Sequence, residues 1–480
     1  MKNKFWLYFI ILQPLLDVVT NLMIKKIDLP ITLGIVVRMS VMMFAFFYVI
    51  HYFYNAKERK MLYFNLLAVG YLFVNLIINL IWKNNFDLME EVAFLAKTAY
   101  PFQMFFVFYI LFKNKWLLKE KITKLFTINL FVISLFIIIP TKLSLSFESY
   151  GNFYEGSVGW FNAANETGAI IAFLLPLVIW SVYKEKNNWL GLITILTATY
   201  AAYLVGTKVS LGSIMMVLVA SSIFIFFKNK IRLDKTLAAV LFSLSFLIIS
   251  FNQSPAIQNV QSVGVEIINK ENNYKIKEEI YTPVQIEQIE QINKLKERSH
   301  PLLTRALSSR DIYVLQHFEY FEEAHPIRKA FGMGYASEYE SKPKTTEMDF
   351  FDFLFSFGIV GALIILITLS RKAIQLVKII WNCVREKKID NFMYFLLVAF
   401  ILLLAVSFVA GHVLFAPSVS LYLAISAAFL YVIIEKETEK ILKALANRRR
   451  VAIVKYLEKA NSASVGDIAE QIKLSFTATS

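Results

Sequence analysis

The hydrophobic and polar positions of this chain are separated into long blocks. Apolar runs such as "ITLGIVVRMSVMMFAFFYVI" and "VSLGSIMMVLVASSIFIFF" alternate with short, charged connections. Runs of about twenty apolar residues have the length of a helix that crosses a bilayer. The pattern therefore predicts an all-α, polytopic membrane protein with about twelve transmembrane helices. The predicted spans are roughly 5–23, 31–53, 61–82, 94–112, 125–140, 160–183, 188–206, 209–227, 236–251, 350–370, 392–412 and 415–434.

Basic residues concentrate in alternate connections, and this predicts the orientation of the spans. The segments "AKERK" (56–60), "KNKWLLKEKITK" (113–124) and "RKAIQLVKIIWNCVREKK" (371–388) all fall on one side, together with both termini. Lysine and arginine are enriched on the cytoplasmic side of membrane proteins. We therefore expect a multi-pass protein of the cytoplasmic membrane with both termini in the cytoplasm. The pair Lys25–Lys26 is an exception, because it falls on the outer side.

One connection is far longer than the others. Residues 252–347 join the ninth span to the tenth and fall on the outer face, so we expect a long extracytoplasmic loop. Connections of this length are usually functional or disordered, and the aromatic content of residues 308–345 argues against disorder there. The sequence thus divides into a membrane domain of residues 1–435 and a cytoplasmic tail of residues 436–480.

Composition supports this class and excludes several others. Hydrophobic residues make up 57% of the 480 positions, above the ~45–50% usual in soluble domains. The single cysteine, Cys383, excludes a disulfide framework. The sequence has no nucleotide-binding glycine loop, no HExxH motif and no cysteine–histidine cluster, so we expect no metal and no cofactor. The net charge of +14 is largely explained by the basic connections.

Two ionisable residues lie inside the first two predicted spans. Asp17 and Arg38 each lie about 10 Å below the outer surface if the helices are regular, so they could pair. Ionisable residues inside spans are rare and often functional. A buried salt bridge that fixes helix packing is the alternative interpretation.

Further polar residues mark the outer ends of later spans. Asn162, Asn165 and Glu166 lie at the outer end of the sixth span, and we expect Asn162 and Glu166 on one helix face. Capping and interfacial solvation are the alternative for these three. Lys208 lies in the short outer turn before the eighth span, where snorkelling to the interface is the alternative.

Arg310 and Arg328 lie in the long outer loop, and each of them could equally be solvated surface. Together with Lys208 and Arg38, they predict a cationic region at the outer leaflet. Such a region suits an anionic lipid head group, above all a diphosphate, because arginine binds phosphate through two hydrogen bonds and lysine as a point charge. We assign diphosphate binding to Arg38, Lys208 and Arg328. The residues that we expect to support this region are Asp17, Asn162, Asn165 and Glu166.

The outer loop and the tenth span carry a resemblance to a known family. The segment "SSRDIYVLQHFEYFEEAHPIRKAFGMGYASEYESKPKTTEMDFFDFLFSFGIVGALIIL" is similar to the signature region of the O-antigen ligase and polymerase family. The matching residues are Arg310, Gly332, Gly334, Gly358 and Gly361. "GWFNAANETGAIIAFLLPL" and "GTKVSLGSIMMVL" resemble two other regions of the family, and the resemblance covers roughly residues 1–435.

The resemblance implies a function. It implies a metal-independent glycosyltransferase that acts at the outer leaflet in envelope polysaccharide synthesis. The donor would be a polyprenyl-diphosphate-linked glycan held beside membrane lipid, and the acceptor a second glycan or another envelope component. The sequence does not distinguish a polymerase from a ligase, and it identifies neither the sugar nor the acceptor.

Two departures from the family pattern shape the predicted site. Counted from Gly358, Glu347 stands where the family has a histidine, and Lys208 stands where it has an arginine. We expect Glu347 or Asp349 to accept the proton of the acceptor hydroxyl, because a carboxylate is a competent general base. Arg310 completes the predicted catalytic residues by stabilising the charge of the departing diphosphate.

Other residues at the start of the tenth span have a structural interpretation. Asp349 and Asp352 lie three residues apart where the helix begins, so capping is an equally good interpretation of both. Gly358 and Gly361 are expected to permit close helix packing.

The tail resembles a different family. Residues 441–480 are similar to the first part of an arsenic-repressor-type winged helix, but the recognition helix and the wing are missing. Because the recognition helix supplies the base contacts, we do not expect nucleic-acid binding. A basic juxtamembrane helix pair is the alternative interpretation of the tail.

Two other functions stay open. A transporter or flippase for lipid-linked glycan would share the cationic region and the number of spans, but its polar residues would extend through the membrane midplane. A membrane-tethered DNA-binding regulator would require a complete DNA-binding tail.

Overall fold

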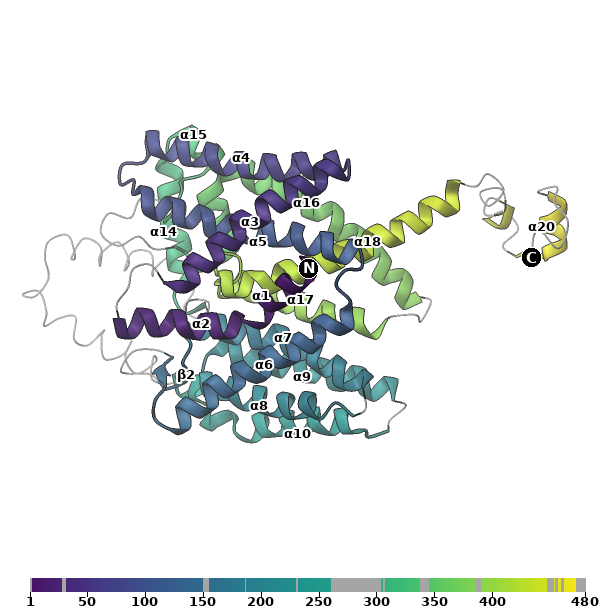
Figure 1. Ribbon diagram of the computed structural model, residues 1–480, viewed down its shortest axis with the longest axis horizontal. Coiled ribbons are helices and arrows are strands. Elements are labelled where there is room, and N and C mark those ends of the chain that lie inside the picture. The colour runs from purple at the N-terminus through teal and green to yellow at the C-terminus, as the bar shows by residue number, and fades with distance from the viewer. Residues whose placement is uncertain are drawn as a thin grey trace, which may run out of the picture. The chain divides into compact units, whose positions relative to one another are not determined.

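The computed structural model is built almost entirely of helices (Figure 1). It describes residues 2–27, 32–149, 155–185, 187–229, 232–259, 304, 307–336, 345–385, 390–446, 453, 456–458 and 462–471. Within these residues the only sheet is the antiparallel pair β1–β2, in which Phe147 faces Gly159.

The helices of the first half follow one another closely along the chain. They are α1 (Lys2–Ile11), α2 (Gln13–Leu22), the π-helix η1 (Met23–Ile27), α3 (Leu33–Asn55), α4 (Arg59–Trp82), α5 (Leu88–Lys113) and α6 (Lys119–Lys142). The strands β1 (Phe147–Glu148) and β2 (Ser157–Gly159) come next, and α7 (Ala164–Lys184), α8 (Trp189–Val205), α9 (Lys208–Lys228) and α10 (Lys235–Ile249) follow them.

The second half contains the long connection and the last spans. The 3₁₀-helix η2 (Phe251–Gln253) opens the connection, whose later described part holds α14 (Arg310–Glu323) and α15 (Pro326–Phe331). The remaining helices are α16 (Asp349–Arg385), α17 (Asn391–Val409), α18 (Pro417–Ala446) and α20 (Val465–Gln471).

Each of the twelve predicted apolar segments coincides with a helix or a helix pair. Within the described residues, nine helices are long and apolar enough to cross a membrane. The pair α1–α2 would make a tenth span, but it is bent by 47° beside Pro14, whose ring cannot continue a regular helix. α8 and α10 are apolar but shorter, with 17 and 15 residues. The all-α polytopic class is confirmed, and three of the predicted spans are bent or short.

Two predicted helix boundaries are wrong. Residues 371–388 were expected to form a connection, but α16 stays helical as far as Arg385. α18 likewise continues past residue 434 to Ala446, so it runs through the expected start of the tail. Lysine and arginine are good helix formers whose long side chains reach water from a helix, so a basic run need not end one.

The chain forms two compact units. The larger consists of residues 1–368 and 389–428, and the smaller of residues 369–388 and 429–480. In the smaller unit, the Lys372 ammonium lies 4.2 Å from the centre of the Tyr431 ring, a cation–π contact between α16 and α18. All of the predicted site residues belong to the larger unit.

α7 forms the core of the larger unit. Its sequence is apolar on every side, as expected of a helix surrounded by protein, and 89% of its most apolar stretch is buried. It packs against α6, α8, α9 and α17 (Figure 1). A second group of helices consists of α3, α4 and α5, and α15 lies along α4. Most of the predicted site residues lie near helix ends or in turns, whereas Asp17 and Arg38 lie inside α2 and α3.

Candidate functional site

Arg310 and Glu347 meet although 36 residues separate them in the sequence. Arg310 is the first residue of α14, and Glu347 lies two residues before α16. The Nη2 atom of Arg310 is 3.2 Å from Oε2 of Glu347. The exposed fraction of the side chain is 12% for Arg310 and 32% for Glu347, so the pair lies in a partly open position.

Lys208 reaches the same turn from another element. It is the first residue of α9, which Thr207 caps by accepting the Ser210 N–H. Its ammonium donates to the hydroxyl of Ser308 at 3.2 Å, two residues before Arg310. The structure therefore brings three predicted site residues, Lys208, Arg310 and Glu347, around the start of α14.

Strained backbone concentrates in this region. Ser308, Ser309, Glu347 and His412 have positive φ angles of 54°, 67°, 57° and 59°. Gly411 lies against Glu347, because a Cβ atom at Gly411 would come within 3 Å of the Glu347 carbonyl. Left-handed backbone in non-glycine residues costs free energy and often occurs at functional sites, so these segments form a candidate site.

Asp349 binds a hydroxyl and two backbone N–H groups, and its predicted role as a base stays a prediction. Its Oδ2 atom accepts hydrogen bonds from Ser407 Oγ at 2.7 Å and from the N–H groups of Val413 and Leu414 at 2.9 Å each. Its exposed fraction is 1%. With Oδ2 committed to three donors and no access to solvent, Asp349 ties the turn after α17 to the start of α16.

Asp352 also binds backbone. Its Oδ1 atom accepts the Thr346 N–H at 2.6 Å, which fixes the chain just before Glu347. The contacts of Asp349 and Asp352 therefore agree with the structural interpretation of both residues. The groups that they bind belong to the preceding turn, to α17 and to the turn after it, and not to the first turn of α16.

His412 is a candidate site residue that sequence reasoning missed. It lies in the turn between α17 and α18, is half-buried, and is an electrostatic neighbour of both Glu166 and Asp349. The five histidines looked scattered along the chain. The available signal was a histidine directly after a glycine at the end of an apolar span, which is a weak pattern without the tertiary structure.

Glu166 projects from the first turn of α7 toward this turn. Its Oε2 atom accepts a hydrogen bond from Ser418 Oγ at 2.6 Å, and Glu166 is half-buried. Asn165 is half-buried beside it, whereas Asn162 is exposed and precedes α7. The expected i, i+4 relation of Asn162 to Glu166 is therefore wrong, because the helix begins only at Ala164.

Asp17 and Arg38 form the expected ion pair inside the membrane domain. Nη2 of Arg38 also donates to Oε1 of Gln13 at 2.9 Å, and Gln13 lies one helical turn before Asp17 on α2. The Arg38 and Asp17 side chains are 11% and 17% exposed. Because Arg38 already has two partners, its arrangement fits the packing role at least as well as diphosphate binding.

α16 is broken inside its apolar run. Gly358 has φ 67° and ψ −175°, which interrupts the helix and leaves the preceding carbonyls without helical partners. The N–H of Met333 donates to the Phe355 carbonyl at 2.8 Å, and the N–H of Gly334 donates to the Ser356 carbonyl at 3.2 Å. The turn after α15 therefore satisfies the broken end, as buried backbone in a membrane requires.

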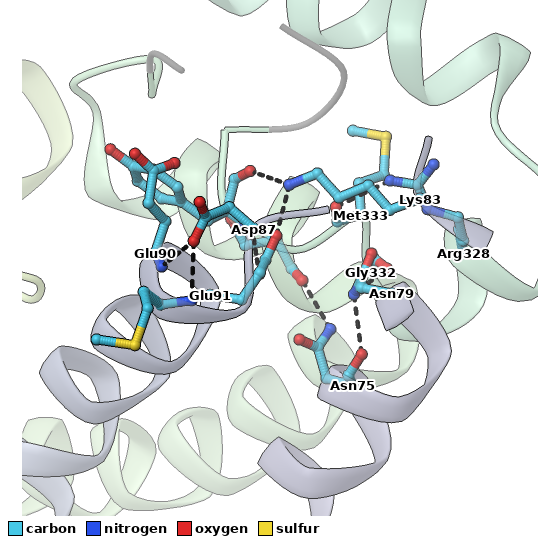
Figure 2. Close-up of polar contacts among 12 residues, drawn as sticks. Asn75, Asn79, Lys83, Asp87, Glu90, Glu91, Arg328, Gly332 and Met333 are labelled. Carbon is cyan, nitrogen blue, oxygen red and sulfur yellow. Dashed lines mark hydrogen bonds and ion pairs between the residues drawn. The ribbon is translucent and has the colours of Figure 1, made fainter. Parts of the chain in front are cut away.

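A polar stripe on α4 holds this turn in place (Figure 2). Tyr71 donates to the Phe357 carbonyl at 2.5 Å, and Asn75 donates to the carbonyls of Phe331 and Ser356 at 2.8 and 2.9 Å. Asn79, one turn further along α4, donates to the Gly332 carbonyl at 3.3 Å. Sequence reasoning missed this stripe, although Tyr71, Asn75, Asn79 and Lys83 follow at intervals of four in an apolar span.

A buried ion pair ends the stripe. Lys83 Nζ lies 2.5 Å from Glu91 Oε1 and donates to the Tyr335 carbonyl at 2.6 Å (Figure 2). The other oxygen of Glu91 accepts the Tyr335 N–H at 2.9 Å. Arg328 of α15 donates to the Met333 carbonyl at 2.9 Å. These contacts place Arg328 with the turn that fills the break in α16, a role the sequence did not suggest.

Arg328 stays cationic in this position. Burial lowers the pKa of its guanidinium to about 10, against the opposing effect of the nearby Glu91 carboxylate. Burial also raises the pKa of the Tyr335 hydroxyl, helped by the carboxylates of Glu90 and Asp352. Both groups therefore keep their protons at neutral pH.

Comparison with known proteins adds the family. Residues 1–437 match the model of the O-antigen ligase like membrane protein family. The chain belongs to this family. No curated protein and no solved structure matches the chain. The winged-helix resemblance of the tail has no support from these comparisons and stays a prediction.

Membership of the O-antigen ligase family sets the general class of this protein. It is an integral membrane protein, and the family supports ligation or polymerisation of envelope glycans from lipid-linked and acceptor substrates in the membrane. Among the described residues of this family member, no group of three or more histidine, cysteine or acidic side chains could hold a metal ion.

Proposed function

We propose that this protein transfers a glycan from a polyprenyl diphosphate to the hydroxyl of an acceptor at the outer leaflet of the cytoplasmic membrane. The observation that carries the proposal is the meeting of Lys208, Arg310 and Glu347. These residues come from three separate parts of the chain, each expected on the outer side. Two cations beside one half-exposed carboxylate suit a phosphate-activated donor and a hydroxyl acceptor.

Lys208 and Arg310 would bind the diphosphate. In the structure Arg310 contacts Glu347, and an incoming diphosphate would compete for the guanidinium with two phosphates in place of one carboxylate. Glu347 would then be released beside the reacting sugar. Arg38 and Arg328 are not needed for this step, because the contacts described above engage them with Asp17 and Gln13 and with the Met333 carbonyl.

In the transfer, one proton moves to Glu347, and one bond at the anomeric carbon replaces another. The acceptor oxygen attacks the anomeric carbon of the donor sugar while Glu347 accepts the hydroxyl proton. The bond from the anomeric carbon to the diphosphate oxygen breaks, and the electron pair leaves with the polyprenyl diphosphate. Lys208 and Arg310 stabilise the charge that develops on that oxygen.

Reconstituted vesicles loaded with a defined polyprenyl-diphosphate glycan test the proposal. Arg310→Ala, Lys208→Ala and Glu347→Gln should each reduce product on a glycan ladder by about 10²-fold or more. Lys184→Ala is the control, because Lys184 belongs to an exposed ion pair with Glu120 away from these residues. Full-length product from all three site variants would rule the proposed roles out.

A transporter of lipid-linked glycan is the second candidate. Two helices are broken, α1–α2 beside Pro14 and α16 at Gly358, and broken helices line the substrate sites of many transporters. Translocation of a labelled lipid-linked glycan in the same vesicles, without formation of any glycosidic bond, would favour this function over transfer.

We also propose that residues 436–480 form a cytoplasmic appendage outside the reacting part of the chain. The family match ends at residue 437, and α20 falls within the segment that resembles the first helix of a helix-turn-helix. A chain shortened to residue 446, the end of α18, should keep its glycan-transfer activity in vesicles. Reporter fusions at both termini would test their cytoplasmic location.

A further inference from the structure

The turn that carries Lys208 is very short. α8 ends at Val205 and α9 begins at Lys208, so only Gly206 and Thr207 lie between the two helices. The Lys208 side chain is exposed, and its ammonium reaches Ser308 in a distant part of the chain. Lysine has a flexible stem, so the place where its backbone is fixed limits where the ammonium can bind. The contacts of this turn therefore matter for the candidate site.

Asn259 binds the turn and a second loop at the same time. It lies in the first part of the long connection, after η2. Its Nδ2 atom donates to the carbonyl of Gly206 at 3.3 Å and to that of Glu155 at 2.6 Å. Its Oδ1 atom accepts the Glu155 N–H at 2.7 Å. The exposed fraction of Asn259 is 8%, so one buried amide joins the start of the connection to the α8–α9 turn and to the loop between β1 and β2.

Other contacts hold the same turn from both sides. Ser149, directly after β1, donates through its hydroxyl to the Val205 carbonyl at 2.6 Å. A Cβ atom at Gly206 would lie 2.7 Å from Cβ of Pro255, and one at Gly156 would lie 2.8 Å from the Val205 carbonyl oxygen. The hairpin loop and the start of the connection thus pack directly against the turn. Its position depends on these two segments as well as on α8 and α9.

We propose that Asn259 is a positioning residue for glycan transfer, and that it acts through Lys208. By fixing the Gly206 carbonyl, it would keep the Lys208 ammonium at the start of α14, where Lys208 and Arg310 bind one diphosphate together. This rests on the proposed function, which assigns the diphosphate to these two cations. They come from distant parts of the chain, so only tertiary contacts set their separation, and a binding group displaced by about 1 Å can cost as much as ~10²-fold in rate.

The KM for the donor tests the proposal in vesicles that contain the full chain. The donor is the defined polyprenyl-diphosphate glycan, and the KM for the acceptor and kcat are measured on the same preparations. Asn259→Ala should raise the KM for the donor about tenfold and leave the KM for the acceptor unchanged. A smaller folded fraction would lower the apparent kcat and change neither KM. The two KM values therefore separate positioning from a loss of stability.

Coupling to Lys208 is the sharper measurement. In a Lys208→Ala background, Asn259→Ala should raise the KM for the donor by no more than about twofold, because no lysine is then left to be misplaced. Asn259→Asp should raise the KM for the donor as much as Asn259→Ala does. Aspartate keeps an acceptor for the Glu155 N–H, but its carboxylate cannot donate to the two carbonyls.

Ser149→Ala provides a milder variant in case Asn259→Ala does not fold. It removes one hydrogen bond from the same turn at a half-buried position, and the KM for the donor should rise about threefold. Asn188→Ala is the matched control at the opposite end of α8. The Asn188 amide accepts the Gly191 N–H at 2.9 Å and donates to Ser181 at 3.1 Å. Its loss should lower the melting temperature and leave the KM for the donor unchanged.

The outcomes distinguish this role from the proposed function. An unchanged KM for the donor in both Asn259→Ala and Ser149→Ala would overturn the positioning role and leave the proposed function standing. So would effects of Asn259→Ala and Lys208→Ala that add fully, because Asn259 would then not act through Lys208. A tenfold rise in Asn188→Ala would overturn it as well, since any loss at α8 would then suffice. An unchanged KM for the donor in Lys208→Ala would overturn the assignment of Lys208 to the diphosphate, and the role of Asn259 with it.

Discussion

The backbones of Gly332 and Gly358 are in contact. Gly332 lies in the turn after α15, and Gly358 lies at the break in α16. A Cβ atom at Gly332 would lie within 3 Å of the Ser356 carbonyl, and one at Gly358 would lie within 3 Å of the Gly332 nitrogen. Both glycines have positive φ, 107° and 67°. Two backbones therefore touch at this point, and only glycine permits it on either side.

Gly358→Ala should lower the free energy of unfolding by about 3 kcal/mol, because alanine would adopt a backbone conformation reserved for glycine and would collide with Gly332. Thermal unfolding in detergent measures the effect. Gly70→Ala is the control, since nothing lies within 4 Å of a Cβ atom at this position on α4. Its stability should be unchanged or increased by up to ~1 kcal/mol. Equal melting temperatures for the two variants would show that the break does not depend on Gly358.

Asn75→Ala should destabilise the protein by about 2 kcal/mol, because the buried carbonyls of Phe331 and Ser356 both lose a donor. Limited proteolysis should show faster cleavage in the turn after α15. Asn55→Ala removes an exposed asparagine whose side chain contacts only His51 in the described structure, and it serves as the control. Faster cleavage in both variants would mean that the effect is not specific to the α4 stripe.

Lys83→Met should cost about 3–5 kcal/mol, because it leaves the Glu91 carboxylate buried without its cation. Replacing both residues, as Lys83→Met with Glu91→Leu, should recover much of this loss, since neither charge of the pair is then buried without the other. A double-mutant cycle on melting in detergent measures the coupling. The exposed pair Lys184–Glu120, with side chains 44% and 40% exposed, should show a coupling of no more than about 1 kcal/mol. A similar coupling free energy in both pairs would contradict the prediction that burial strengthens the Lys83–Glu91 pair.

Arg38→Gln combined with Asp17→Asn should retain most glycan-transfer activity, because the double variant removes both charges of one ion pair. Arg38→Gln alone should destabilise the protein by about 3–5 kcal/mol by leaving Asp17 unpaired. Activity in vesicles and melting temperature are measured on the same preparations. If the double variant is stable but its KM for the donor rises about tenfold, Arg38 contributes to diphosphate binding.

The predicted spans agree with the structure because their signal is local. An apolar run of twenty residues has few alternatives to a membrane helix, whatever surrounds it. The predicted helix boundaries are wrong where two local signals compete. In residues 371–388, positive charge indicates the cytoplasmic side of the membrane, but the chain stays helical as far as Arg385. Hydropathy also does not predict that α7 begins at Ala164, because this boundary depends on the turn before the helix.

The candidate site was only partly accessible from the sequence. Lys208 and Glu347 lie near the outer ends of spans and Arg310 lies in the long outer loop, and the resemblance to a family directs attention to all three. The pairing of Arg310 with Glu347, and the separate place of Arg328 beside the break in α16, depend on how the long connection folds back. Asp349 carries the same charge as Glu347 but binds backbone, which no local pattern distinguishes.

The sequence by itself determined that this chain is a helical membrane protein, because the length of its hydrophobic runs acts segment by segment. The tertiary structure alone decided which polar groups meet. Ser418 binds Glu166, and the α4 stripe holds the broken helix, because buried polar groups must find partners and those partners lie far away along the chain.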